Sequence, residues 1–469
     1  MSPRARKGGR VLGCFATLGM AFLLATQVLG GADLSLQTLG ALRLNPKNPR
    51  AGLVQGGDGN FYGTTTLGGT NGENGTVFQI TPGGELTVVH SFRGTDGALP
   101  YASLVQGSDG GFYGTAQSGG TNGDFGTVFR ITTNGDFTNL HYFSGLDGRS
   151  PQAALVEGNE GSLYGTTAAG GTNGDHGTVF KVTSTGAFTS LFSFSGTNGA
   201  HPLAGLIQGI DGNFYGTTSE GGPNYNGTPA SAHGAVFRIT PAGSLTPMFY
   251  FRGTNGSSPA ASLVEGSDGN FYGTTEFGGA NGDNGTVFKF TTSGELTTLF
   301  SFSGPNGNYP RAGLTVGGDG NLYGTTSGDR LFGGTNTFGT VFRLTPNSVV
   351  TTLVAFNNTS GASPVAGLTL GNDGNLYGTT FEGGLGGGGT IFRMVEQPLV
   401  GAVLPSSGTV VVTWTSFTNG NYRLEHTLAL DNPSWTALVP DIIASNSKTS
   451  ITNSVDGVAI RYYRIRLIP

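Results

Sequence analysis

The chain has 469 residues, of which 86 are glycine and only 11% are charged, against about 25% charged residues in an ordinary globular domain. This much glycine excludes a mainly helical protein, and the 10% aromatic content excludes a disordered one, because aromatic side chains bury large areas. The formal net charge is −5, and glycine shows no collagen-like period, so the composition indicates a turn-rich, all-β chain.

Residues 1–31 have the pattern of a secretory signal peptide. Four cations, the last of them Arg10, precede an apolar run from Val11 to Leu29, and small residues follow it. An uncleaved membrane anchor is the alternative, although glycine and polar residues interrupt the run. We expect a secreted protein, in the periplasm, at the cell surface or outside the cell, with no membrane span after cleavage.

Removal of this segment changes the charge and the redox chemistry of the chain. It leaves 19 Lys and Arg against 28 Asp and Glu, a net charge of about −9, which makes nucleic acid a poor partner. The single cysteine, Cys14, lies in the apolar run, so the mature chain would hold no disulfide and no thiolate metal site.

The stretch of residues 35–396 repeats one unit seven times. Most copies of Tyr-Gly-Thr are 51 residues apart, and the two longer intervals contain insertions near residues 223–232 and 329–331. The copies begin at Tyr62, Tyr113, Tyr164, Tyr215, Tyr272, Tyr323 and Tyr377. Repetition with a period of this size is typical of propellers and solenoids.

Each copy contains four short apolar segments separated by turn residues. In the third copy they are residues 154–157, 163–166, 178–182 and 188–194, all of strand length and rich in β-branched or aromatic side chains. Asp-Gly or a similar pair separates the first two segments, which favours a tight hairpin. Four antiparallel strands at a period near 50 residues match a propeller blade.

The two ends of the repeat complement each other. The seventh copy stops at Met394 without a fourth strand, whereas Leu36–Leu42 precedes the first copy just as Leu296–Phe302 precedes the sixth. Pairing the first segment with the last copy would leave no open sheet edge. We therefore predict a seven-bladed β-propeller closed by an N-terminal strand, with a β-helix or a chain of small sheets as the alternative.

Residues 398–469 no longer carry the repeat. Five further strands are expected there, at residues 409–415, 422–427, 435–439, 448–452 and 460–467. Their alternating pattern suggests a small β-sandwich module, joined to the repeat by a linker near Gln397 and Pro398.

The repeat also carries a family resemblance. The series D-G-N-[FL]-Y-G-T-T, G-G-T-N-G-D-x-G-T-V-F and L-T-x-L-x-x-F resembles the GloVer tandem repeat of exported bacterial proteins described as choice-of-anchor. That resemblance implies a propeller-like exported protein and no activity that could be assigned to a residue. The C-terminal stretch resembles short fibronectin-like modules, but it lacks the hydrophobic helix and basic tail of a membrane-sorting signal.

Strand order places the loops on two faces. Short hairpin turns share one face, which we call the short-loop face. The other, the long-loop face, holds the long hairpin loops between second and third strands and the linking loops that join one copy to the next. Binding sites usually occupy variable loops on a rigid scaffold, so we expect the site on the long-loop face.

Three histidines of this face suggest a metal site. His176 and His233 occupy equivalent positions in the long hairpin loops of copies three and four, and His201 lies in the linking loop between these copies. Imidazole is a ligand for zinc and other divalent metals. The equivalent positions in the other copies hold unrelated residues, so plain turn residues are the alternative. No other cofactor is expected.

Aromatic side chains of the same face suggest a ligand surface. The candidates are Tyr225, Phe277, Tyr309 and Phe332, which could contact a glycan or a protein. We expect a monomeric, non-catalytic binding scaffold. The alternative is a carbohydrate-active enzyme, a polysaccharide lyase or hydrolase, which would need convergent acids, a histidine or a metal in one pocket.

Overall fold

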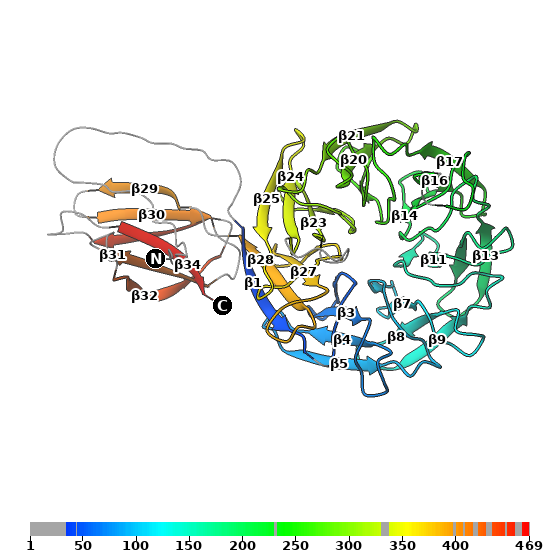
Figure 1. Ribbon diagram of the computed structural model, residues 1–469. Helices are drawn as coiled ribbons and strands as arrows, with labels where there is room; N and C mark the ends of the chain where they lie inside the picture. Colours follow the sequence, from blue (N-terminus) through cyan, green and yellow to red (C-terminus); the bar gives the residue numbers. More distant parts are fainter. Residues whose placement is uncertain are drawn as a thin grey trace, which may run out of the picture. The chain divides into compact units, whose positions relative to one another are not determined.

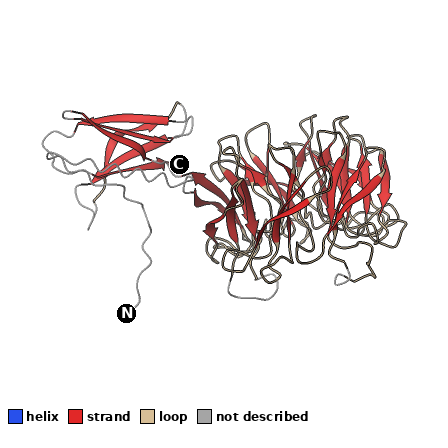
Figure 2. Cartoon of the chain, turned by 90° about the horizontal axis from the view of Figure 1, so that it is seen from above, coloured by secondary structure: helices blue, strands red, loops and turns tan. Residues whose placement is uncertain are grey.

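The computed structural model describes residues 34–43, 45–228, 232–329 and 337–396, and then 400–406, 409–415, 421–427, 434–445, 448–454 and 462–468. Every regular element among them is a β-strand (Figure 2). Two compact units are present, one comprising Leu36–Met394 and the other holding the chain from Val395 onwards, and each is described by itself. The predicted signal peptide lies outside the described residues. Nowhere in the described chain is there a helix with the length and apolar character to cross a bilayer.

In the unit Leu36–Met394, four-stranded antiparallel sheets follow one another around a ring (Figure 1). The sheets have the orders β2-β3-β4-β5, β6-β7-β8-β9, β10-β11-β12-β13, β14-β15-β16-β17, β18-β19-β20-β21, β22-β23-β24-β25 and β1-β28-β27-β26. The prediction of four antiparallel strands in each copy is confirmed.

The first two strands of each copy form its tight hairpin. The first strands are β2 (Val54–Gln55), β6 (Val105–Gln106), β10 (Val156–Glu157), β14 (Ile207–Gln208), β18 (Val264–Glu265), β22 (Thr315–Val316) and β26 (Thr369–Leu370). The second strands are β3 (Phe61–Thr65), β7 (Phe112–Ala116), β11 (Leu163–Thr167), β15 (Phe214–Thr218), β19 (Phe271–Thr275), β23 (Leu322–Thr326) and β27 (Leu376–Thr380). The first strands are shorter than the sequence predicts, because the residues before them line a pocket instead.

The last two strands of each copy form the outer part of its sheet. The third strands are β4 (Thr76–Ile80), β8 (Thr127–Ile131), β12 (Thr178–Val182), β16 (Ala235–Ile239), β20 (Thr286–Phe290), β24 (Thr340–Leu344) and β28 (Thr390–Glu396). The fourth strands are β5 (Leu86–Ser91), β9 (Phe137–Tyr142), β13 (Phe188–Ser193), β17 (Leu245–Tyr250), β21 (Leu296–Ser301) and β25 (Val350–Ala355). In Figure 1, β11 lies toward the middle of the ring and β13 at its outer side.

The N-terminal strand joins the last copy, as its sequence predicts. β1 (Leu34–Ala41) pairs with β28, the third strand of the seventh copy. Leu42, Phe78 and Ile391 share one buried cluster, so the two ends of the repeat pack together. The backbone N–H of Asn372 also donates to Oε1 of Gln55 at 2.7 Å, which links the seventh copy to the first.

The Tyr-Gly-Thr motif joins each sheet to its neighbours. In the first copy, the Tyr62 ring packs on Phe112 of the next sheet with 4.2 Å between ring centroids. Gly63 makes room for Phe78, because a Cβ there would stand 2.6 Å from the Phe78 ring. The Thr64 hydroxyl donates to the carbonyl of Ala102 in the next copy at 3.1 Å. All three residues are therefore required by contacts within or between sheets.

The threonine bond recurs in every copy. Its O···O distances lie between 3.0 and 3.5 Å for Thr64–Ala102, Thr115–Ala153, Thr166–Ala204, Thr217–Ala261, Thr274–Ala312, Thr325–Ala366 and Thr379–Ala51. The last bond returns from the seventh copy to the first. A hydroxyl buried between sheets needs such a partner, since an unpaired one costs about 1–3 kcal/mol.

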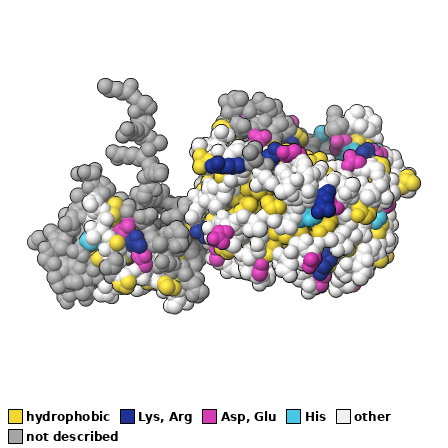
Figure 3. All heavy atoms as spheres, turned by 90° about the horizontal axis from the view of Figure 1, so that it is seen from below, with side chains coloured by type: hydrophobic (Ala, Val, Ile, Leu, Met, Phe, Trp, Pro, Cys, Tyr) yellow, Lys and Arg dark blue, Asp and Glu magenta, His cyan; other side chains and the backbone are white. Residues whose placement is uncertain are grey.

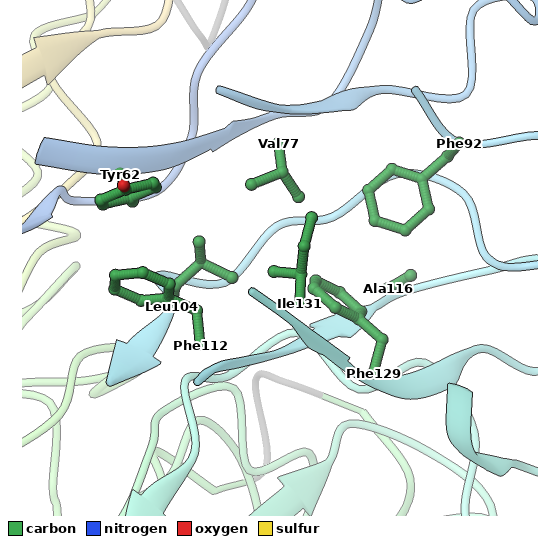
Figure 4. Close-up of a cluster of buried hydrophobic side chains, with 8 residues drawn as sticks. All are labelled: Tyr62, Val77, Phe92, Leu104, Phe112, Ala116, Phe129 and Ile131. Carbon is green, nitrogen blue, oxygen red and sulfur yellow. The ribbon is translucent and has the colours of Figure 1, made fainter. Parts of the chain in front are cut away.

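The hydrophobic core lies between neighbouring sheets. Figure 4 shows one such cluster, in which side chains of the first two sheets point toward one another. Its buried members are Tyr62, Val77, Phe92, Leu104, Phe112, Ala116, Phe129 and Ile131. Each sheet thus depends on its neighbour to bury its apolar face.

Some of the charged side chains lie in pairs of opposite sign. On the short-loop face, Nη2 of Arg130 lies 2.8 Å from Asp109, and Nζ of Lys289 lies 2.7 Å from Asp268. In the view of Figure 3, Lys and Arg lie mostly beside Asp or Glu on a surface that is otherwise largely uncharged. Exposed pairs of this kind contribute little to stability, about 0–1 kcal/mol each.

The second unit contains two three-stranded antiparallel sheets, with the orders β29-β30-β33 and β32-β31-β34. Their strands are β29 (Val400–Ser406), β30 (Thr409–Thr415), β31 (Asn421–Thr427), β32 (Thr436–Ile443), β33 (Lys448–Ser454) and β34 (Tyr462–Ile468). Trp414 of one sheet and Tyr422 of the other are fully buried in one cluster. The sequence analysis missed β29, in which Gly401 and Pro405 interrupt the strand pattern.

Candidate functional site

Each linking loop ends in a residue with left-handed backbone followed by proline. The φ angles of these residues lie between 53° and 60°, where side chains other than glycine are strained. They are Asn48, Leu99, Ser150, His201, Ser258, Tyr309 and Ser363. Each donates its N–H to a carbonyl of the preceding long hairpin loop, as His201 does to His176 at 2.9 Å. These bonds hold the linking loops in place around the ring.

The residues after these prolines line a pocket of about 310 Å³. Its lining comes from every copy, so the pocket lies at the middle of the ring on the long-loop face. One lining residue of each copy stands between the proline and an alanine: Arg50, Tyr101, Gln152, Leu203, Ala260, Arg311 and Val365. The proline and the alanine are the same in all copies, whereas the residue between them changes. A repeated scaffold thus surrounds a pocket with different chemistry on each side.

One side of the pocket holds a buried ion pair. Nε of Arg311 donates to Oε1 of Glu276 at 2.8 Å, and Nη2 of the same arginine contacts the same oxygen. The Glu276 residue is only 7% exposed. Burial raises the pKa of Glu276, although the nearby Arg311 acts in the opposite direction. This pair satisfies the charge of Arg311 within the protein.

Arg50 stands at the equivalent position of the first copy and has different neighbours. Its guanidinium carbon lies 4.4 Å from the centroid of the Phe381 ring and 4.8 Å from that of Tyr101. Among the described residues it makes no hydrogen bond and no ion pair. Burial lowers the pKa of Arg50, and the positive charge of Arg311 adds to this effect. The pocket therefore contains one arginine that is held by aromatic rings rather than by a carboxylate.

Besides Ser262, whose hydroxyl oxygen accepts from the N–H of Gly205 at 3.0 Å, three further polar side chains line the same pocket, Tyr101, Ser103 and Gln152. Within the described chain, none of their hydroxyl or amide groups has a hydrogen-bond partner. They can donate to and accept from a ligand, because a hydroxyl or amide group does both. The pocket combines these groups with the apolar side chains of Leu203, Ala260 and Val365.

The structure brings two of the three predicted histidines together. The ring centroids of His176 and His201 are 6.2 Å apart, and Tyr225 lies 5.5 Å from His176. The Tyr225 hydroxyl donates to Oε2 of Glu220 at 3.0 Å. Burial, together with Glu220, raises the pKa of Tyr225 to about 12. Burial also lowers the pKa of His176, and a charge on His201 would lower it further.

His233 lies elsewhere. Its backbone carbonyl accepts from Ser258 at 3.0 Å, and its Nδ1 lies 3.1 Å from Oγ of Ser257, so it belongs to the next linking loop around the ring. In the part of the chain that the structure describes, no group of three or more His, Cys, Asp or Glu residues is arranged to hold a metal. His233 thus contacts the linking loop that follows its copy, whereas His201 lies in the linking loop that precedes it. A metal site at His176, His201 and His233 stays a prediction.

Three of the four predicted aromatic contacts are described, and they separate into two groups. Phe277 and Tyr309 contact each other, with ring centroids 5.6 Å apart. Phe277 follows Glu276 directly in the sequence, and Tyr309 stands two residues before Arg311. Tyr225 lies with the histidines described above. Phe332 falls outside the described residues. The ligand-binding role of all four stays a prediction.

The residues that line the pocket, above all Arg50, Tyr101 and Arg311, were not predicted from the sequence. The site was expected in the longest loops, whereas the pocket is built from the residues that follow the linking loops. A usable signal was present in the repeat itself. In a motif that keeps Pro and Ala in all seven copies, the residue between them varies from Arg to Ala.

The chain belongs to the Gloeobacter/Verrucomicrobia repeat family, whose sequence model matches residues 29–230 and 229–435. The resemblance to the GloVer repeat is therefore confirmed. No curated protein is similar enough to this chain to count as a match.

Several solved structures share the general shape at low identity. The extracellular domain of a hybrid two-component system from B. thetaiotaomicron has a TM-score of 0.48 and 13% identity, over 93% of this chain and 56% of that chain, little more than half of its length. A gluconolactonase from Xanthomonas campestris has a TM-score of 0.41 and 14% identity, over 82% and 98% of the two chains. An α-L-arabinanase from Penicillium chrysogenum, complexed with arabinobiose, has a TM-score of 0.37 and 12% identity, over 63% and 92%. Likenesses at this level carry no functional inference.

Proposed function

We propose that the chain is a secreted, non-catalytic binding module that takes a glycan at the pocket on the long-loop face. In this proposal residues 35–396 form a seven-bladed β-propeller closed by β1, and residues 398–469 form a fibronectin-like β-sandwich. The pairing of β1 with β28 and the bond from Thr379 back to Ala51 support closure of the ring.

The observation that carries the proposal is the change of side chain around the pocket. A residue needed for folding recurs in every copy, as the threonine of Tyr-Gly-Thr does. The lining position instead holds two arginines, a tyrosine, a glutamine and three different apolar residues. Such a mixture of apolar surface and a few polar groups is typical of small-ligand pockets.

The pocket does not supply the pair of carboxyl groups that a glycoside hydrolase needs. Glycoside hydrolysis ordinarily uses two carboxyl groups on either side of the bond that breaks. Glu276 is the only Asp or Glu among the lining residues, and it is paired with Arg311. A single carboxyl group that is paired with an arginine does not meet this requirement. The pocket therefore favours binding over hydrolysis.

A glycan array probed with the purified protein tests this function. We expect retention of a defined set of glycans by the wild-type chain and loss of retention in Ala260→Trp, because the new indole would fill the pocket. Ser267→Trp is the matched control, since Ser267 is exposed in a short hairpin turn of the same copy. It should bind as the wild type does.

Three results would overturn the proposal. Failure of every glycan to bind would point to a protein ligand or to none. Equal binding by Ala260→Trp would move the site away from the pocket. Release of reducing sugar from any retained polysaccharide would show that the protein is an enzyme.

A further inference from the structure

Copies one and six carry an arginine at the same pocket position, but the residue that faces it differs. Arg311 of the sixth copy pairs with Glu276, the residue after Tyr-Gly-Thr-Thr in the fifth copy. For Arg50 of the first copy, the preceding copy around the ring is the seventh. The equivalent residue there, after Tyr-Gly-Thr-Thr, is Phe381. A phenyl ring therefore occupies the place where the other arginine has its carboxylate.

Among the residues that the structure describes, this exchange leaves the charge of Arg50 without a hydrogen bond or an ion pair. The rings of Phe381 and Tyr101 hold the guanidinium at 4.4 and 4.8 Å but accept none of its N–H groups in a conventional hydrogen bond. Glu382 influences Arg50 electrostatically without a hydrogen bond or ion pair to it in the described structure. A planar guanidinium with free donors is suited to bidentate contact with an oxyanion.

We propose that Arg50 binds the carboxylate of an acidic saccharide, a uronate, in this pocket. The proposal rests on the proposed function and names the chemical class of its ligand. The carboxylate would accept two N–H groups from Arg50, and the sugar hydroxyls would bond with Tyr101, Ser103 and Gln152.

The balance of charge selects a singly charged anion. Of the lining residues, Arg50 and Arg311 are positive and Glu276 is negative, which leaves one positive charge for the ligand to neutralise. A carboxylate carries one negative charge, whereas a phosphate monoester carries close to two at neutral pH. The pocket volume of about 310 Å³ is at the low end of ligand sites, about 300–1,000 Å³, and suits one sugar ring.

Titration of the full chain with glucuronate and with glucose, followed by NMR, tests the proposal. We expect glucuronate to bind at least 10-fold more tightly than glucose. Arg50→Met should weaken glucuronate binding about 10- to 100-fold and leave glucose binding little changed, because a charge-assisted contact is lost.

A second variant separates ligand binding from folding. Phe381→Glu places a carboxylate beside Arg50, as Glu276 stands beside Arg311, and should weaken glucuronate binding by about 10-fold. Phe381→Leu removes the ring without adding a carboxylate and should weaken glucuronate binding less than Phe381→Glu does. Thermal unfolding of all three variants checks that they fold.

Other outcomes would overturn the uronate proposal. They are equal affinity for glucose and glucuronate, Arg50-dependent binding of inorganic phosphate or sulfate in place of glucuronate, or displacement of glucuronate by an acidic peptide of higher affinity. If array glycans still bind and Ala260→Trp still abolishes that binding, the proposed function stands and only the uronate assignment fails.

Discussion

Neighbouring residues of the linking loops serve the scaffold and the pocket separately. The carbonyl of Ala51 accepts the hydroxyl of Thr379 from the preceding copy, and this bond has a counterpart in every copy. Arg50, one residue earlier, lines the pocket and shares its identity with only one other copy. A residue that joins two sheets is set by a contact that recurs, whereas a pocket residue is free to differ because its partner is not part of the scaffold.

Adding one methyl group to the glycine of Tyr-Gly-Thr should disrupt the contacts of the scaffold most strongly. In the third copy, a Cβ on Gly165 would stand 2.5 Å from the Phe180 ring and 2.7 Å from Cδ2 of Leu155. Both neighbours are buried, so Gly165→Ala should lower the free energy of unfolding by about 3 kcal/mol through overpacking. Urea denaturation of the variant measures this loss.

Gly57→Ala is the matched control, because nothing lies within 4 Å of the Cβ that it would add. Its stability should stay within about 0.5 kcal/mol of the wild type. Equal losses in both variants would mean that the close contact with Phe180 is not what selects glycine.

Removal of the threonine hydroxyl tests the bond between sheets with a smaller expected effect. Thr166→Val keeps the shape of the side chain but removes the donor to the Ala204 carbonyl, which lies 3.0 Å away. The buried carbonyl then loses a hydrogen bond, and we expect the free energy of unfolding to fall by about 1–2 kcal/mol. Thr189→Val, on the exposed side of the same sheet, should change it by less than about 0.5 kcal/mol. A larger effect of Thr189→Val would contradict this account.

The difference between repeated scaffold residues and variable pocket residues also explains how much of the fold the sequence predicts. The strand pattern and the place of β1 are predictable, because each repeated residue reports a contact that occurs once per copy. The short first strands are less predictable, since Ala154 was expected in a strand and lies at the pocket instead. β29 is missed because it contains Gly401 and Pro405 and has no second copy to compare.

The candidate site is predictable only in part. The long-loop face follows from strand order, and the contact between His176 and His201 follows from loop order. The pairing of Arg311 with Glu276 depends on which side chains face each other across two copies, and spacing along the chain does not give that. His233 shows the limit in the other direction. It occupies the position equivalent to His176 in the next copy, but in the structure it contacts the linking loop that follows that copy.

One position of the fourth strand is less constant than the scaffold residues and less variable than the pocket residues. In the first five copies it holds either histidine or phenylalanine. In copies one and two a histidine of the fourth strand contacts an aspartate of the linking loop, as Nε2 of His141 does with Asp147 at 2.9 Å. Copies three to five have phenylalanine and asparagine instead, for example Phe192 and Asn198. Asn198 accepts from the N–H of Ser195, just as Asp147 accepts from that of Ser144, so the turn is kept in both forms.

In copy two, the histidine form should make stability depend on pH. Burial lowers the pKa of His141 below its usual 6.5, and the bond to Asp147 only partly offsets this. The unfolded chain therefore takes up the proton first as the pH falls. The resulting loss of stability begins near pH 6.5 and continues down to the pKa of the folded state, whereas above pH 6.5 the contribution is constant.

Replacing the histidine form with the phenylalanine form should remove this dependence, the smallest of the effects expected here. The double variant His141→Phe, Asp147→Asn copies the third repeat and should lose less stability than the wild type between pH 7 and about pH 5 in urea denaturation. Asp147→Asn alone is the informative control, because it removes the group that raises the pKa of His141 and should steepen the loss. If both variants follow the wild-type pH profile, the protonation of His141 is not coupled to folding, and the two forms are interchangeable packing solutions.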